Sequence, residues 1–217
     1  MDLLTATLGQ FGSVADIMRR GGLIMWPLLG LSVLAATLLL ERLWLFARTN
    51  APGRLTKVAA MGKRLRLGQR DQALQLADAD ASIYGDTVRR LLDEPLSEAL
   101  VTEVLESQRR KLERFLPTLS TIITAAPMLG ILGTVLGIID SFNVLGDPTT
   151  SRDPSLVGQG IAAALLSTAA GLVVALATLF PYSLLRSQVN ATLSRLEALA
   201  ASAGSSPPTP QRPAADS

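Results

Sequence analysis

The sequence contains no cysteine and no histidine among its 217 residues. Their absence excludes disulfide bonds, thiol nucleophiles and the usual zinc and haem ligands, and it removes the side chain that most often acts as a general base. The 20 basic and 18 acidic residues nearly balance, so charge gives no reason to expect a nucleic-acid partner. No phosphate-binding loop or catalytic constellation is present either, so we expect neither an enzyme nor a bound metal or cofactor.

The main feature of the sequence is a set of long apolar stretches with few charged residues. Hydrophobic residues make up 48% of the chain, which is high for a water-soluble domain. The stretches 21–46, 116–142 and 158–185 are each long enough to cross a lipid bilayer, which takes about 20 mainly apolar residues. The sequence therefore predicts an all-α integral membrane protein with three transmembrane helices.

The second and third of these spans carry small residues at three- and four-residue steps, which places them on one face of each helix. Helices in lipid associate through close backbone approach at small residues, because lipid tails are as apolar as leucine. We therefore expect both faces to pack against protein. The residues predicted to make these helix contacts are Gly130, Gly133, Gly137, Ala164, Gly171 and Ala175.

Basic residues are distributed unevenly between the connections. More than a dozen lie in 47–115, whereas the short connection 143–157 contains only Arg152. The positive-inside rule therefore predicts that 47–115 is cytoplasmic and that 143–157 is outside. With three spans, the N-terminus is then outside and the C-terminus is cytoplasmic, and Glu41 and Arg42 mark the cytoplasmic end of the first span.

The N-terminal residues 1–20 have apolar side chains at helical spacing. This pattern predicts an amphipathic helix that lies on the outer surface of the membrane that the chain spans, and a simple packing helix is the alternative. Arg19 and Arg20 oppose the orientation derived above, but the basic residues of the cytoplasmic region outnumber them.

The polar regions are predicted to form mainly helices that extend the spans into the cytoplasm. Within 47–115, helices are predicted at 51–68, 71–79 and 89–93, and a helix at 97–115 is expected to continue into the second span without a break. Residues 186–203 continue the third span as a cytoplasmic helix, and the proline-rich residues 204–217 predict a disordered tail.

Three motifs carry a resemblance to a known family. The segments APMLGILGTVLGIIDSF (126–142) and GIAAALLSTAAGLVVALATLFPY (160–182) resemble the second- and third-span signatures of the MotA/TolQ/ExbB proton channel family. The segment GGLIMWPLLGLSVLAATLLLERL (21–43) is similar to the first span of its ExbB/TolQ branch. The three-span count and the large cytoplasmic insertion agree with that branch.

The resemblance implies a subunit of the bacterial inner membrane that forms a homopentamer around two copies of a single-span ExbD- or TolR-like protein. Proton flow down the proton-motive force then drives motion that reaches the outer membrane, with a TonB- or TolA-like protein as a further candidate partner. A titrating aspartate belongs to the partner's helix. Matching the motifs assigns Thr134 and Thr168 to the lumen of the pentamer, and Ser167 and Ser141 are assigned to the same lining.

Two alternatives stay open. Many relatives have glutamate within the GIAEAL motif of the third span, where this chain has Ala163. A non-conducting membrane scaffold of the same fold is therefore the second functional hypothesis. Thr134 and Thr168 also have a purely structural interpretation, in which each hydroxyl bonds to a carbonyl of its own helix. The sequence leaves open whether the energised process is nutrient uptake, envelope maintenance, motility or secretion.

Overall fold

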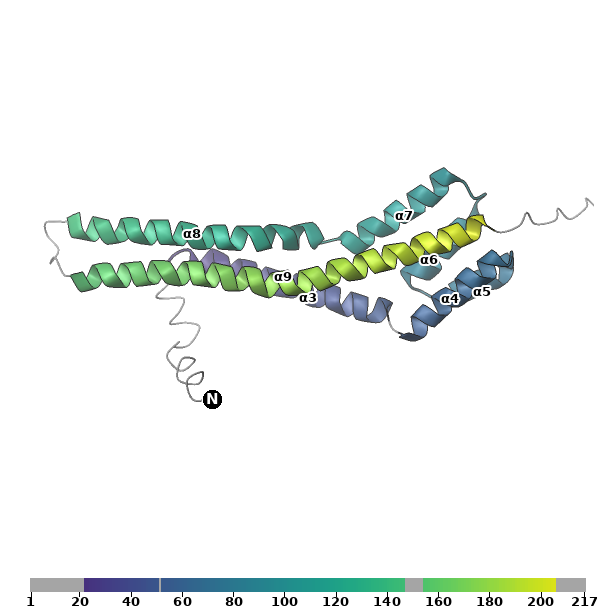
Figure 1. Cartoon of the computed structure of the whole chain (residues 1–217), viewed down its shortest axis with the longest axis horizontal. Coiled ribbons are helices and arrows are strands. Elements are labelled where there is room, and N and C mark those ends of the chain that lie inside the picture. The colour runs from purple at the N-terminus through teal and green to yellow at the C-terminus, as the bar shows by residue number, and fades with distance from the viewer. Residues whose placement is uncertain (1–21, 51, 147–153, 206–217) are drawn as a thin grey trace, which may run out of the picture. The chain divides into compact units, whose positions relative to one another are not determined.

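A computed structural model describes residues 22–50, 52–146 and 154–205 of the chain. Within these residues every regular element is a helix, and three helical stretches are long and apolar enough to cross a membrane, which confirms the predicted fold class. In chain order, the helices are α3 (Met25–Thr49), α4 (Pro52–Arg66), α5 (Arg70–Asp78), α6 (Ile83–Asp93), α7 (Glu98–Glu113), α8 (Leu116–Gly146) and α9 (Pro154–Gly204) (Figure 1). The predicted N-terminal helix, most of the predicted tail and the centre of the 143–157 connection lie outside the described residues.

The described chain divides into two compact units. The apolar unit comprises residues up to Glu41 together with Phe115–Ser183, and the polar unit comprises Arg42–Arg114 together with the chain from Leu184 onward. Helices α3 and α9 each contribute to both units, and α8 belongs to the apolar unit alone.

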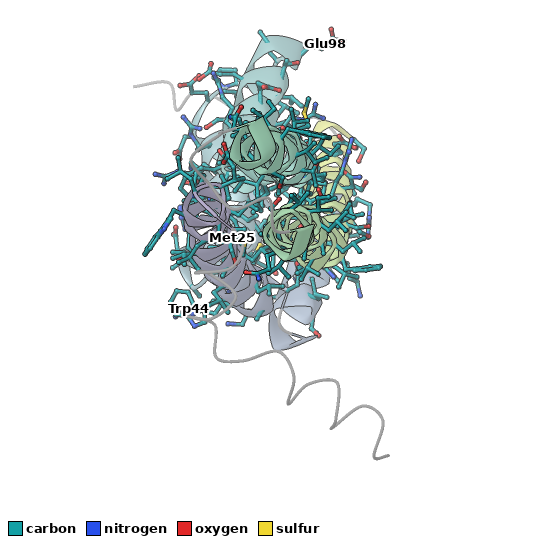
Figure 2. All side chains as sticks on the ribbon, turned by 90° about the vertical axis from the view of Figure 1, so that its left-hand side faces the viewer. Met25, Trp44 and Glu98 are labelled. Carbon is teal, nitrogen blue, oxygen red and sulfur yellow. The ribbon has the colours of Figure 1, made fainter. Side chains whose placement is uncertain are left out.

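Three helices pack side by side in the apolar unit. Met25 and Leu28 of α3 meet Ala126 of α8 and Ala175 of α9 in one buried cluster. Figure 2 faces the end at which α8 finishes and α9 starts, and it shows Met25 on the side of α3 that faces these two helices. The outer surface is apolar, with side chains such as Val173 64% exposed. An exposed surface of this kind and length fits a lipid bilayer rather than water.

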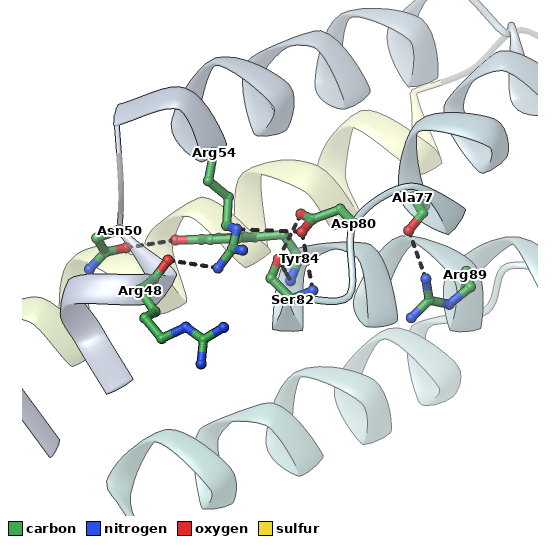
Figure 3. Close-up of polar contacts among 8 residues, drawn as sticks. All are labelled: Arg48, Asn50, Arg54, Ala77, Asp80, Ser82, Tyr84 and Arg89. Atoms are coloured by element: carbon green, nitrogen blue, oxygen red, sulfur yellow. Dashed lines mark hydrogen bonds and ion pairs between the residues drawn. The ribbon is translucent and has the colours of Figure 1, made fainter. Parts of the chain in front are cut away.

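The polar unit is organised around Tyr84, whose side chain is fully buried on α6. Its hydroxyl donates to Asn50 Oδ1 at 3.2 Å, and Arg195 of α9 donates to the same oxygen at 3.2 Å. Ser82 caps α6 by accepting from the Tyr84 amide, and its own hydroxyl donates to Asp80 at 2.7 Å (Figure 3). These bonds tie the end of α3, the start of α6 and α9 together within this unit.

One carboxylate of the polar unit has a perturbed pKa. Partial burial raises the pKa of Asp86, but hydrogen bonds from Gln108 at 2.6 Å and Lys111 at 3.2 Å outweigh burial, and the pKa lies below its ordinary value. The carboxylate is therefore ionised near neutral pH, and it joins α6 to α7 through a charged contact.

Two sequence predictions about the polar helices were wrong. Helix α6 begins at Ile83 rather than at residue 89, because Ser82 supplies an N-cap and Tyr84, Val88 and Leu91 form one buried face. Helix α7 does not run on into α8. Arg114 and Phe115 interrupt the helix, and Phe115 adopts a positive φ of 73°.

Pro117 gives a physical reason for this interruption. In a continuous helix its ring would clash with the carbonyl of Glu113, and the hydrogen bond to that carbonyl would be lost. The break instead places Pro117 in the first turn of α8, where no amide donor is needed. The turn therefore falls at the boundary between the two units.

Candidate functional site

Helices α8 and α9 approach each other so closely that side chains are excluded from part of their contact. A Cβ atom added to Gly130 would lie 2.9 Å from both the Ser167 carbonyl oxygen and the Thr168 Cα. One added to Gly171 would lie 2.5 Å from the Ala126 carbonyl oxygen. Real Cβ atoms do not tolerate such distances from backbone, so glycine is required at these two positions for the observed separation.

The two small-residue faces run antiparallel along this contact. A Cβ atom on Gly137 would lie 2.7 Å from the Ala164 Cβ, and Cβ atoms on Gly133 and Gly160 would overlap the hydroxyls of Ser167 and Ser141. Ala164 is 3% exposed, and Ala175 packs in the buried cluster with α3. All six residues predicted to make helix contacts therefore lie where helices of the same chain meet.

Hydroxyl groups of α9 bind the backbone of α8 directly. The Gly130 carbonyl oxygen accepts from Thr168 Oγ1 at 2.9 Å, and Ser167 Oγ lies within 3.1 Å of it. Ser167 Oγ also lies 2.7 Å from the carbonyl oxygen of Ala164 in its own helix. Hydrogen bonds between membrane helices contribute about 0.6 kcal/mol each on average. Ser167 and Thr168 therefore help to fix how α9 docks on α8.

The four predicted pore-lining hydroxyls divide into two pairs. Ser167 and Ser141 are buried in the α8–α9 contact, where Ser141 Oγ donates to the Gly137 carbonyl at 2.7 Å. Thr134 and Thr168 are only half-buried, and both line one groove on the surface of the α8–α9 pair. The structure thus places both threonines in one groove, which neither serine lines.

This threonine groove has a volume of about 500 Å³. Apart from its two hydroxyls, the lining is entirely apolar; it consists of Ile131, Ile138, Ile161, Ala164, Leu165, Ala169 and Leu172. Thr134 Oγ1 donates to the Ile131 carbonyl at 2.6 Å, and Thr168 Oγ1 donates to the Gly130 carbonyl. Because each hydroxyl proton is engaged, each threonine oxygen presents acceptor lone pairs to the groove.

The charged pair at the end of the first span, Glu41 and Arg42, does not line this groove. Glu41 is exposed, whereas Arg42 is 2% exposed and its Nη1 donates to the Lys111 carbonyl oxygen at 3.3 Å. Arg42 therefore packs α3 against α7 in the polar unit. The described residues hold no group of three or more acidic side chains that could bind a metal ion.

These features define a class of protein: a membrane protein with three potential spans, whose second and third spanning helices share a small-residue contact and an apolar groove that contains two threonine hydroxyls. Comparison with known sequences specifies the class further. A profile of the MotA/TolQ/ExbB proton channel family matches residues 75–198, more than half of the chain. The chain belongs to this family, which energises transport and is not a family of enzymes.

Individual relatives agree with the ExbB/TolQ branch. A putative biopolymer transport protein described as ExbB-like 3 from Synechocystis is 34% identical over 77% of this chain and 82% of its own length. The Vibrio cholerae biopolymer transport protein exbB1 is 30% identical over 85% of this chain and 84% of its own length. The Haemophilus influenzae Tol-Pal system protein TolQ is 38% identical over 37% of this chain and 35% of its own length.

The glycine contact predicts a position-dependent effect of one added methyl group. Gly171→Ala should destabilise the folded protein in detergent by about 1–3 kcal/mol, because overpacking forces the α8 and α9 backbones apart. Gly30→Ala is the matched control, since a Cβ there meets nothing within 4 Å. Unfolding monitored by circular dichroism measures both variants. Equal stability of the two would contradict the importance of the α8–α9 contact.

Proposed function

We propose that this chain is the inner-membrane proton-channel or stator subunit of a complex that couples the proton-motive force to work at the cell envelope. The observation that carries the proposal is the pair Thr134 and Thr168, two hydroxyls in one otherwise apolar groove. Membership of a proton-channel family supports the same function. The partner in this proposal is a single-span ExbD- or TolR-like protein with an acidic residue in its helix.

The groove suits the neutral form of such an acid. A carboxylate in the apolar region of a membrane is costly, so the partner's acid crosses it most easily when protonated. Thr134 and Thr168 present acceptor lone pairs, because their own protons are donated to Ile131 and Gly130. A protonated carboxyl, or a water molecule, can donate to these oxygens. The acid therefore takes up its proton at one end of the groove, is held neutral along it, and releases the proton at the other end.

The single chain leaves this groove open, so we propose that copies of the chain assemble with the groove toward a shared lumen. Leu165 is 62% exposed in the groove wall, which supports its contact with another protein or with lipid in the assembled state. A homopentamer around two partner helices is the arrangement that the family resemblance implies. In this arrangement the chain supplies an uncharged wall, and the partner supplies the titrating group.

The comparisons favour energised transport over envelope maintenance as the process served. The Synechocystis ExbB-like 3 protein and Vibrio cholerae exbB1 align with 77% and 85% of this chain, whereas the TolQ relative aligns with 37%. We therefore propose an ExbB-type role, with a TonB-like protein as the element that carries the work toward the outer membrane.

Replacing the two hydroxyls by methyl groups tests the proton pathway. The double variant Thr134→Val, Thr168→Val should still insert and assemble, because valine has nearly the shape of threonine. It should lose activity driven by the proton-motive force by about tenfold or more, equivalent to about 1.4 kcal/mol. Growth or uptake that depends on the complex, normalised to membrane abundance, measures the effect.

Thr134→Ser, Thr168→Ser is the matched control, since it keeps both hydroxyls and should retain most of the activity. Loss of the Thr168 bond to Gly130 should weaken the association of α8 with α9 by only about 0.6 kcal/mol. Assembly is therefore checked separately by size-exclusion chromatography. Full activity of the valine variant would contradict the proposal and favour a non-conducting scaffold.

The proposed orientation puts 47–115 in the cytoplasm, with the N-terminus in the periplasm and the C-terminus in the cytoplasm. The natural chain has no cysteine, so a thiol reagent can label only the single cysteine that is introduced. Gln75→Cys lies at an exposed position of α5 and should resist a membrane-impermeant thiol reagent in spheroplasts. Ser151→Cys, in the connection between α8 and α9, should react. The reverse labelling pattern would contradict the proposed orientation and support the inverted one.

A further inference from the structure

Two grooves of opposite charge flank the C-terminal part of α9 in the polar unit. The basic groove lies between α4 and α9, has a volume of about 340 Å³ and contains Arg66 and Arg195. The acidic groove lies between α7 and α9, has a volume of about 550 Å³ and contains Glu98 and Glu197. Among the described lining residues, the basic groove has no acidic side chain and the acidic groove has no basic one.

The two grooves lie on opposite faces of α9. Successive residues of a helix are about 100° apart, so the α9 residues of each groove fall within an arc of about 100°, and the two arcs are centred about half a turn apart. These residues are Arg195, Ala198, Leu199 and Ser202 in the basic groove, and Glu197, Ala200, Ala201 and Gly204 in the acidic groove. Figure 1 shows α4 and α7 on either side of this part of α9. One copy of the chain can therefore offer both grooves to other molecules at the same time.

The charges of both grooves are uncompensated within the described part of the chain. Arg66, Glu98 and Glu197 form no ion pair with another described residue. The side-chain hydrogen bonds of Arg195 go to neutral oxygens at 3.2 and 3.5 Å, so they fix the guanidinium without neutralising it. Two positive charges on one face and two negative charges on the other are thus available to a partner.

Apolar side chains form the floor of each groove. Leu55 and Leu199 lie beneath the arginines, and Leu96, Val101 and Leu105 lie beneath the glutamates. An apolar centre with charged groups around it is the usual composition of a protein–protein contact, in which the charges select the partner and its orientation. The surface that matches each groove in charge is the other groove, which every copy of this chain carries.

We propose that the polar units of neighbouring copies interlock, with α4 of one copy seated in the acidic groove of the next and α7 of that copy seated in the basic groove of the first. Arg66 and Arg195 then face Glu98 and Glu197 across the contact. Because the two surfaces differ, the contact is heterologous, and contacts of this kind close into rings when the rotation allows. Closure into a ring rests on the assembly proposed above, but the contact uses no residue of the threonine groove.

Cross-linking between two differently tagged full-length chains tests this contact. One chain carries Ala59→Cys, at an exposed position of α4 in the basic groove, and the other carries Thr102→Cys, at an exposed position of α7 in the acidic groove. The natural chain has no cysteine, so oxidation of membranes that contain both chains should give a disulfide-linked product bearing both tags. Either chain alone should give at least several-fold less dimer, because a heterologous contact places unlike positions together.

Charge reversal then tests what selects the partner. Arg66→Glu in the Ala59→Cys chain should lower the yield of the mixed product several-fold, because like charges then meet across the contact. Adding Glu98→Arg to the Thr102→Cys chain should restore much of that yield. Lys57→Glu is the matched control, since it makes the same charge change at an exposed position of α4 that does not line the groove, and it should leave the yield unchanged.

Three results would overturn the proposal. They are the absence of the mixed product, equal dimer yields from either chain alone, and a yield that Arg66→Glu lowers no more than Lys57→Glu does. The readout is a covalent link between copies and needs no proton flow. Failure of this contact is therefore distinguished from failure of the proposed function, which the activity of the threonine variants reports.

Discussion

The close approach of α8 and α9 is the constraint on which the rest of the apolar unit depends. Helices in lipid gain little from apolar burial against one another, so their association relies on van der Waals contact and hydrogen bonds between backbones and small side chains. Gly130 combines both effects, because its missing Cβ allows Thr168 to approach and its carbonyl oxygen accepts the Thr168 hydroxyl. A larger residue at this position would both separate the two helices and break that hydrogen bond.

This contact determines which polar groups remain available to a partner. It buries Ser141 and Ser167 and leaves Thr134 and Thr168 at the edge, on a groove with apolar walls. On the other side, the same two helices and α3 form a cleft that contains Asp140. The chain therefore presents an uncharged, hydrogen-bond-accepting surface in one place and a carboxylate in another. In our account, the first surface serves the partner's acid.

Hydropathy and periodicity predicted the all-helical class and the three potential spans, because both depend only on residue type and spacing. They did not tell Ser167 from Thr168, since adjacent residues differ by only about 100° around a helix and packing decides which one is buried. They also missed the start of α6, where Gly85 lies inside the helix and its missing Cβ makes room for the backbone of Asp80. The spacing of Tyr84, Val88 and Leu91 was the available signal.

The central claim is that the threonine groove faces the partner helix in the assembled complex. A photoreactive amino acid at Leu165 or at Val173 tests it most directly, because both positions lie on α9 and are 62% and 64% exposed, but only Leu165 lines the groove. After irradiation in cells that also produce the single-span partner, the account predicts a cross-link to that partner from position 165 and little or none from position 173. Capture from position 173 alone, or equally from both, would contradict it.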